Sequence, residues 1–156
     1  MRAAVFSDTH SCMALMVEAV RRVRPDVIIH LGDYERDTMS LESAFPEIPL
    51  YRVRGNCDIG GSAPDYDTVP LGPVKAFITH GHLYNVSWGS FDSLAYAAME
   101  NDCQIALFGH THRAAYEELG NVKIINPGTA GKGTELTYAF IEVLDNGGIK
   151  CEIRDL

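Results

Sequence analysis

The sequence lacks any apolar run that approaches the length of a membrane span, about 18 residues. Its opening residues reach a charge too early for a secretory signal. Cysteine is scarce, and Cys12, Cys57, Cys103 and Cys151 include no Cys-x-x-Cys pair, which speaks against a disulfide framework or a zinc ribbon. We therefore expect a cytoplasmic protein with reduced thiols and no membrane partner.

Positively charged residues are also few compared with negatively charged ones. The 13 Lys and Arg residues face 21 Asp and Glu residues, which gives a net charge of −8. Such a surface disfavours sequence-blind binding to nucleic acid, which stays open only as a substrate. No repeat or low-complexity tract interrupts the 156 residues, and a hydrophobic content of 46% is typical of a globular protein. We expect one domain that spans residues 1–156.

Apolar runs and chain breakers predict βα units first and hairpins last. Strands are expected at 3–6, 27–31, 50–53, 74–79 and 104–108, and helices at 13–23, 38–45 and 90–99, the last capped by Ser90 or Gly89. Residues 59–73 predict a surface loop with a brief strand at 68–71, and the tail predicts strands at 115–118, 123–125, 138–144 and 148–154. This order indicates a mixed α/β sandwich whose strand ends present loops to a ligand.

Five short segments place Asp, His or Asn just after an apolar run: 6–10, 30–34, 54–58, 78–82 and 108–112. Five of the six histidines, all except His30, are among these Asp, His and Asn residues that follow an apolar run. In Asp8-x-His10 and His110-x-His112, a spacing of two predicts that both side chains lie on the same side of an extended segment. Turn chemistry alone would not concentrate imidazoles beside carboxylates in this way, so the pattern predicts a metal site.

The ordered motifs D-x-H, G-D, G-N-x-D, T-H-G-H and G-H-T-H resemble those of the calcineurin-like metallophosphoesterases. The resemblance continues to the Asn-Pro-Gly-Thr segment at 126–129, so it covers nearly the whole chain. In length and in its G-N-C-D motif the chain looks most like the small bacterial and archaeal phosphodiesterase branch. The resemblance implies the metallophosphoesterase fold, an α/β mixed-sheet β-sandwich flanked by helices.

The resemblance also implies a ligand set for two divalent metal ions. One ion would be held by Asp8, His10 and His112, the other by Asn56, His80 and His110, with Asp33 as the bridge. These seven residues are the expected catalytic residues, and Asn56 and His82 are the expected substrate contacts. Carboxylate, imidazole and amide donors suit Mn²⁺, the ion we expect, or Ni²⁺, Fe²⁺ or Zn²⁺, better than Ca²⁺.

The function that the resemblance implies is a metal-dependent phosphodiesterase, in which a hydroxide bridging the two metals attacks phosphorus. Two divalent ions together with ionised Asp8 and Asp33 leave a charge of about +2, which a hydroxide and a small phosphodiester monoanion would neutralise. Two alternatives stay open. One is a non-catalytic scaffold of this fold that binds protein partners, like the retromer relative of the family, and the other is a weak phosphomonoesterase.

The remaining polar residues of the motifs receive supporting roles. Asp58 and Cys57 are expected to lie behind the ligands, and Cys57 stands where many relatives carry a histidine that can protonate the leaving group. His30 is expected to be buried and hydrogen-bonded beneath the Asp33 loop. His82 and the turn at 126–129 stay open between a site role and an ordinary loop role. Substrate specificity is expected in loops 58–67 and 83–89, and a homodimer stays open.

Overall fold

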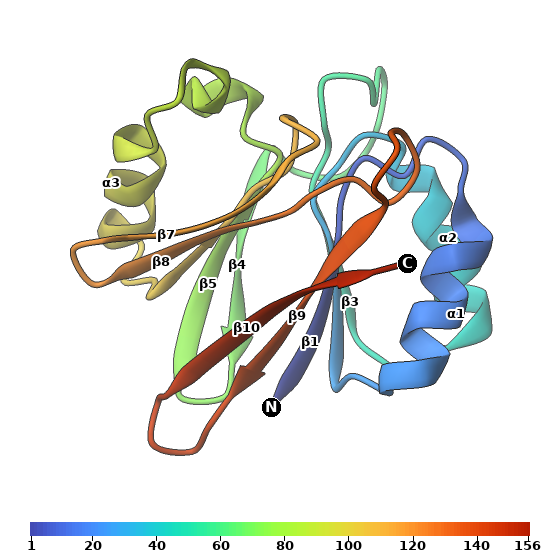
Figure 1. Ribbon diagram of the computed structural model, residues 1–156, viewed down its shortest axis with the longest axis horizontal. Coiled ribbons are helices and arrows are strands. Elements are labelled where there is room, and N and C mark those ends of the chain that lie inside the picture. Colours follow the sequence, from blue (N-terminus) through green and yellow to red (C-terminus); the bar gives the residue numbers. More distant parts are fainter.

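The computed structural model describes residues 1–156, and Figure 1 shows its helices and strands. The strands are β1 (Arg2–Phe6), β2 (Val27–His30), β3 (Leu50–Arg52), β4 (Tyr66–Leu71), β5 (Val74–Thr79), β6 (Ile105–Leu107), β7 (Ala114–Leu119), β8 (Val122–Pro127), β9 (Thr137–Val143) and β10 (Ile149–Asp155). The helices are α1 (Met13–Val23), α2 (Thr38–Ala44) and α3 (Asp92–Glu100), with short 3₁₀ turns η1 (Glu35–Asp37), η2 (His82–Tyr84) and η3 (Val86–Trp88).

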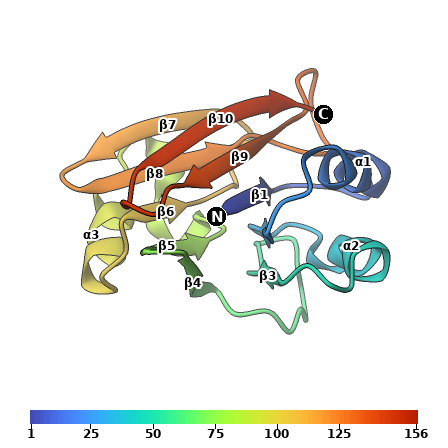
Figure 2. The ribbon, with the colours of Figure 1, turned by 90° about the horizontal axis from the view of Figure 1, so that it is seen from below.

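Two five-stranded sheets pack against each other. The first sheet has the order β10-β9-β1-β2-β3 and the second has the order β4-β5-β6-β8-β7. Both are mixed, because parallel strands at the centre carry antiparallel neighbours. Helices α1 and α2 cover the outer face of the first sheet and α3 covers that of the second, as the view from below shows (Figure 2). The predicted mixed-sheet sandwich flanked by helices is confirmed.

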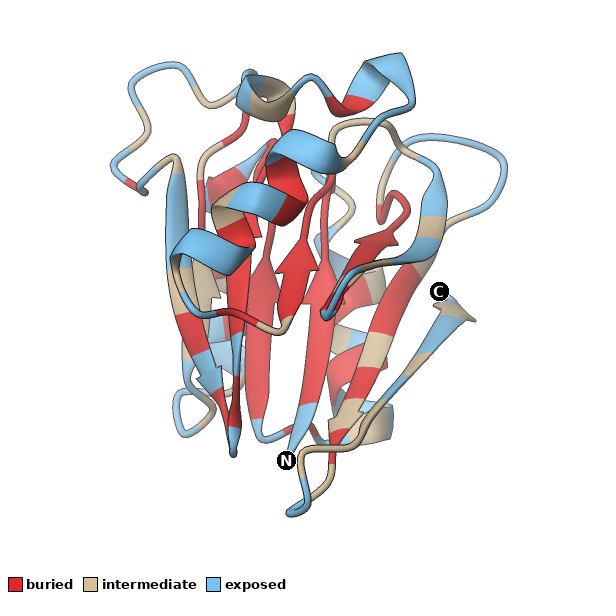
Figure 3. Cartoon of the chain, turned by 90° about the vertical axis from the view of Figure 1, so that its left-hand side faces the viewer, coloured by how far each residue is buried: buried red, intermediate tan, exposed pale blue.

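The largest apolar cluster lies between the two sheets. Val5 and Ile29 of the first sheet meet Ile78 and Leu107 of the second there, within a group of 17 buried residues. The alternate positions of the same strands are buried as well, because they pack under the helices. Figure 3 accordingly shows the central strands buried over most of their length. Burial on both faces explains why these strands read as continuous apolar runs rather than as alternating patterns.

The parallel strands bring the predicted motifs to one edge of the molecule. Strands β1, β2 and β3 run parallel, and so do β5, β6 and β8. Their carboxyl ends meet at the upper edge in Figure 1, where the connecting loops gather. Each of the five predicted segments follows one of these strands. The topology therefore assembles a single site from stretches that are distant in the chain.

Most element boundaries differ from the prediction by one or two residues, and two of these differences have a clear local reason. Strand β4 begins at Tyr66 rather than at residue 68, because it pairs with β5 along its whole length, and Pro70 is tolerated on this edge strand. Helix α3 begins at Asp92, with Phe91 at its N-cap position, so neither Ser90 nor Gly89 is the cap residue. Ser90 Oγ instead accepts the Asp92 N–H at 3.3 Å.

The four cysteines are free and form no disulfide. None of the helices is both long enough and apolar enough to cross a membrane.

Candidate metal centre

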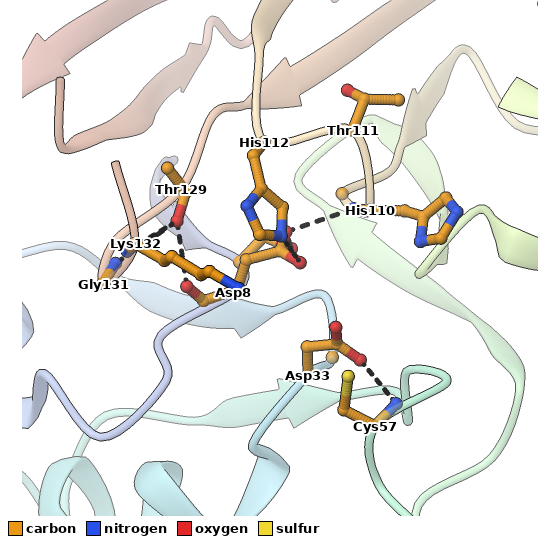
Figure 4. A network of polar contacts seen from close by, with 12 residues as sticks. Asp8, Asp33, Cys57, His110, Thr111, His112, Thr129, Gly131 and Lys132 are labelled. Carbon is orange, nitrogen blue, oxygen red and sulfur yellow. Dashed lines mark hydrogen bonds and ion pairs between the residues drawn. The ribbon is translucent and has the colours of Figure 1, made fainter. Parts of the chain in front are cut away.

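Asp8 is fully buried in the turn that follows β1. Its Oδ2 accepts hydrogen bonds from Ser7 Oγ at 2.6 Å and from the His110 N–H at 3.1 Å (Figure 4). Its Oδ1 has no hydrogen-bond partner and faces His112 Nε2, 3.1 Å away. One oxygen is thus held in place by the protein while the other is free to bind a cation.

Asp33 follows β2 and is also buried. Its Oδ1 accepts the backbone N–H of Cys57 at 2.9 Å and lies 3.4 Å from His80 Nε2. Burial alone would raise the pKa of the Asp33 carboxyl, but the Cys57 N–H and the nearby His80 outweigh it and keep the pKa below its ordinary value. The carboxylate form is therefore the one that the site stabilises.

His80 is fully buried at the end of β5. Its Nδ1 lies 2.8 Å from the carbonyl oxygen of Leu31, which can only accept, so in the neutral ring Nδ1 carries the proton and Nε2 carries the lone pair. That Nε2 faces Asn56 Oδ1 at 3.1 Å and Asp33 Oδ1 at 3.4 Å. In this tautomer three lone-pair atoms converge, an arrangement that a cation would stabilise.

The other site histidines lie close to these groups. The ring centroids of His10 and His112 are 5.4 Å apart, and those of His80 and His110 are 5.1 Å apart. His10 Nε2 is buried without a hydrogen-bond partner, and so is His82 Nδ1. Burial, followed by the charge that His80 carries when it is protonated, lowers the pKa of both His82 and His110, which favours neutral imidazoles.

The structure thus brings all seven predicted ligands together. The ligand atoms of Asp8, His10, Asp33 and His112 all lie within 4.8 Å of one another. The rest of the set, Asn56, His80 and His110, lies around His80, whose Nε2 also approaches Asp33. The donors are oxygen and nitrogen atoms, and two of them, Asp8 Oδ1 and His10 Nε2, are buried without a hydrogen-bond partner. Their chemistry fits divalent transition metal ions.

The extended conformation predicted for Asp8-x-His10 and His110-x-His112 is wrong. Strands β1 and β6 end at Phe6 and Leu107, before these residues, so the segments are turns and not extended chain. The backbone is left-handed at five of the seven predicted ligands: Asp8 (φ 55°), His10 (φ 42°), Asp33 (φ 55°), His110 (φ 67°) and His112 (φ 57°). Strained backbone of this kind is common at functional sites, and here it sets the direction of the predicted ligand side chains.

Two positions of the site need glycine, because the backbone there passes very close to Asp33 or to the Ser7 hydroxyl that holds Asp8. A Cβ at Gly109 would lie 1.9 Å from Ser7 Oγ, and one at Gly55 would lie 2.1 Å from Asp33 Oδ1. Both contacts are far shorter than a carbon atom tolerates. Any larger residue would displace the groups that hold Asp8 and Asp33.

The expected supporting residues lie behind the ligands. Asp58 accepts the N–H groups of Tyr34, Glu35 and Gly55 at 2.8 to 2.9 Å, so it ties the Asp33 turn to the Asn56 turn. His30 is fully buried and accepts the Gly32 N–H at 3.2 Å, and burial lowers its pKa to about 4.

Cys57 contributes to the site through its backbone rather than its side chain. Its N–H holds Asp33, while its side chain is exposed. Hydrogen bonding to the Asp33 carboxylate, together with partial burial, raises the pKa of the Cys57 thiol to about 11. The side chain is therefore a neutral thiol near pH 7.

Several positioning residues were missed in the sequence. Asp37 is buried and its Oδ2 accepts Thr9 Oγ1 and the Ser11 N–H, each at 2.7 Å, so it holds the turn around His10. Glu35 accepts the N–H groups of Ser62 and Ala63. The acidic run that follows Asp33 was the available signal, but the pattern could not show that these carboxylates turn inward.

The turn at 126–129 belongs to the site. Thr129 Oγ1 donates to the Asp8 carbonyl oxygen at 3.0 Å and accepts the Lys132 N–H at 3.1 Å. Figure 4 shows the Lys132 side chain extending toward Asp8. This lysine, which the motifs did not include, adds a positive charge at the rim of the site.

Comparison with known proteins agrees with these observations. Residues 1–146 match the calcineurin-like phosphoesterase superfamily domain. The probable metallophosphoesterase YsnB of Bacillus subtilis is 33% identical over 132 residues, which are 83% of this chain and 75% of that protein. Vacuolar protein sorting-associated protein 29 of Schizosaccharomyces pombe is 41% identical over 81 residues, which are 52% of this chain and 43% of that protein.

Solved structures have the same architecture. A predicted phosphoesterase from Streptococcus pneumoniae superposes with a TM-score of 0.81 at 28% identity and covers 99% of this chain and 88% of its own. An archaeal phosphodiesterase has a TM-score of 0.76 at 21% identity over 99% of this chain and 100% of its own, a likeness of fold alone. The match over residues 1–146 confirms the resemblance seen in the motifs, and the chain therefore belongs to the calcineurin-like phosphoesterase superfamily.

Proposed function

We propose that this protein is a cytoplasmic, metal-dependent phosphodiesterase whose single domain spans residues 1–156. The observation that carries the proposal is the convergence of His80 Nε2, Asn56 Oδ1 and Asp33 Oδ1, while His80 Nδ1 is turned toward the Leu31 carbonyl oxygen. The neighbouring Asp8 Oδ1 is also without a hydrogen-bond donor. Lone pairs that face one another at these distances are costly unless a cation lies among them.

We assign two divalent ions to this cluster of side chains. Asp8, His10 and His112 would hold one, Asn56, His80 and His110 would hold the other, and Asp33 would be shared. Mn²⁺ is the ion we expect, with Ni²⁺, Fe²⁺ and Zn²⁺ as alternatives. When bound, such a pair of ions activates water as a nucleophile and offsets the charge of a phosphoryl group.

The residues of the chain would prepare the site before any substrate arrives. Ser7 and the His110 N–H hold Asp8, the Cys57 N–H holds Asp33, and the Leu31 carbonyl orients His80. Fixed ligands spare the site the cost of reorganisation during the reaction. We place His82, whose Nδ1 is buried without a partner, on the substrate side of the site together with Asn56.

A diester is the substrate class that we propose. Two divalent ions and two aspartates leave a charge of about +2, which suits a hydroxide and one monoanion. The archaeal structural neighbour is itself named a phosphodiesterase. Lys132 adds positive charge at the rim and would help a dianion as well, so weak phosphomonoesterase activity remains compatible with the site.

The test combines metal analysis with two matched substrates. We expect about two Mn²⁺ per chain after loading, and a higher kcat/KM for bis(4-nitrophenyl) phosphate than for 4-nitrophenyl phosphate. A preference for the monoester would contradict the diester assignment. Full activity after verified removal of metal would contradict the metal-dependent mechanism.

A scaffold without catalysis is the second candidate. The observation that favours it is the exposure of Leu83, Trp88, Tyr96 and Met99, with Trp88 87% exposed. The similarity to vacuolar protein sorting-associated protein 29 points the same way. A protein that binds two metal ions but hydrolyses neither substrate would support this candidate, and these apolar residues would then be the first place to look for a partner or for a homodimer contact.

A further inference from the structure

A cleft opens beside His110, on the side of the metal centre that faces α3. It has a volume of about 610 Å³ and lies between residues 86–91 and residues 110–115. We call it the His110 cleft. Its volume is in the range of small-molecule sites and far exceeds the space that a methyl ester needs. Because His110 belongs both to the cleft and to the predicted ligand set, a group bound in the cleft would adjoin a phosphoryl group at the centre.

The walls of the His110 cleft combine apolar surface with hydrogen-bond donors. Val86, Phe91 and Ala114 provide the apolar part. Phe91 is held by Phe108, whose ring centroid is 4.9 Å away, so its ring is a fixed surface for stacking. Thr111 lines the cleft as well, and because its Oγ1 accepts a hydrogen bond from Asn126 Nδ2 at 3.1 Å, its O–H is left free to donate.

The charge of the cleft is opposite to that of the molecule. Arg113 lines it, and the arginine ion pairs of the structure do not include Arg113. No Asp or Glu lines the cleft, although the chain as a whole carries a net charge of −8. A ligand that offers hydrogen-bond acceptors or negative charge would meet donors here and no repulsion.

We propose that the His110 cleft binds a nucleoside as the larger ester group of the substrate. This inference rests on the proposed phosphodiesterase function and names its substrate class. A nucleobase offers a flat ring for Phe91 and acceptor atoms for Arg113 and Thr111. An alkyl or lipid group would leave these donors without partners, and such a mismatch disfavours binding.

The test measures binding rather than turnover. Dissociation constants of the Mn²⁺-loaded protein are measured by calorimetry for methyl phosphate and for thymidine 5′-monophosphate, two monoesters of equal charge that differ only in the ester group. We expect thymidine 5′-monophosphate to bind about tenfold more tightly, the effect of one base stacked on an aromatic side chain. Phenyl phosphate serves as a third ligand, which offers a ring without acceptor atoms.

Two substitutions locate the effect. Ala114→Trp should fill the cleft and remove the preference for thymidine 5′-monophosphate, with methyl phosphate binding unchanged. Ala44→Trp, at an exposed position at the end of α2, is the matched control and should change neither constant. Arg113→Gln should weaken thymidine 5′-monophosphate more than phenyl phosphate, because only the former offers acceptors.

The outcomes separate this inference from the proposed function. Equal binding of methyl phosphate and thymidine 5′-monophosphate would overturn the nucleoside cleft and leave the phosphoryl site intact. Phenyl phosphate that binds as tightly as the nucleotide would also overturn it, since the cleft would then recognise a ring alone. Failure of all three ligands to bind the metal-loaded protein would count against the phosphodiesterase function itself.

Discussion

The two sheets contribute different chemistry to one site. The loops of the first sheet carry every oxygen donor of the predicted ligand set, from Asp8, Asp33 and Asn56, and a single imidazole, His10. The loops of the second sheet carry only imidazoles, from His80, His110 and His112. Neither sheet holds a complete set of ligands for either ion. The centre therefore exists only where the two sheets are packed together.

Hydrogen bonds across the two sheets hold the ligands in place. The His110 N–H of the second sheet binds Asp8 of the first, and His80 Nδ1 binds the Leu31 carbonyl oxygen. Ions bound among these groups would join the same two layers, so we expect metal binding to be coupled to the stability of the fold.

Asp33, which we propose as the ligand shared by two ions, offers the strongest way to break this arrangement. Asp33→Asn removes the anionic donor that lies between the two groups, so we expect loss of both metal ions and a fall in diesterase kcat/KM of more than about a thousandfold. Metal analysis and steady-state kinetics check this. The variant amide can still accept the Cys57 N–H, so the fold should persist.

Asp145→Asn is the matched control for that variant. Asp145 is exposed in the turn between β9 and β10, far along the chain from the ligands, and its change should leave metal content and rate unaltered. If Asp33→Asn kept two metal ions per chain and normal activity, the assignment of Asp33 as the shared ligand would be wrong.

Metal removal should reveal the coupling between the two sheets. A ligand that binds only the folded state at about 100 times its dissociation constant adds about 2.7 kcal/mol of stability. For a chain of this size that corresponds to a Tm rise of about 5–10 °C. We expect Mn²⁺ or Ni²⁺ added to chelator-treated protein to raise the Tm and restore activity, and Ca²⁺ to do neither well. A Tm that is indifferent to every ion would refute the coupling.

The sequence predicted the elements of the fold and the identity of the site residues better than the geometry of the site. Apolar runs on the parallel strands located nearly every element, because strands buried on both faces leave an unmistakable pattern. The motifs identified the residues of the cluster, but not the left-handed turns at Asp8 and His112, since backbone strain is enforced by tertiary contacts. Asp37 was missed for a related reason: a buried carboxylate and an exposed one look alike until its hydrogen-bond donors are known.

His30 of the first sheet differs from the predicted ligands, because it is a buried histidine that supports the Asp33 turn and binds no metal in our assignment. Its pKa of about 4 in the folded protein lies below the ordinary value of 6.5. Between these values the unfolded chain binds a proton that the folded chain does not, so stability falls as the pH drops. From pH 7.5 to 5.5 we expect His30 to account for a loss of about 1.4 kcal/mol in the free energy of unfolding.

Urea unfolding of metal-free protein at the two pH values measures this loss. His30→Asn keeps an acceptor in reach of the Gly32 N–H and cannot be protonated, so its stability should depend less on pH by that amount. The other histidines titrate equally in both proteins and cancel in the difference. Identical pH dependence in wild type and variant would show that His30 is not held neutral by burial.

The smallest effect is expected at Cys57, where the backbone and the side chain can be separated. Cys57→Ala keeps the N–H that holds Asp33, so we expect hydrolysis of aryl diesters to change by no more than about threefold. Cys57→His adds an imidazole that can protonate a leaving group, which should speed alkyl diesters by up to about 10²-fold while aryl diesters gain little. Rates for a series of leaving groups, at verified metal content, measure both effects. A hundredfold loss on aryl diesters in Cys57→Ala, with metal and fold intact, would mean that the thiol itself takes part, and the first sheet would then contribute a thiol to the reaction besides its oxygen donors, His10 and backbone groups.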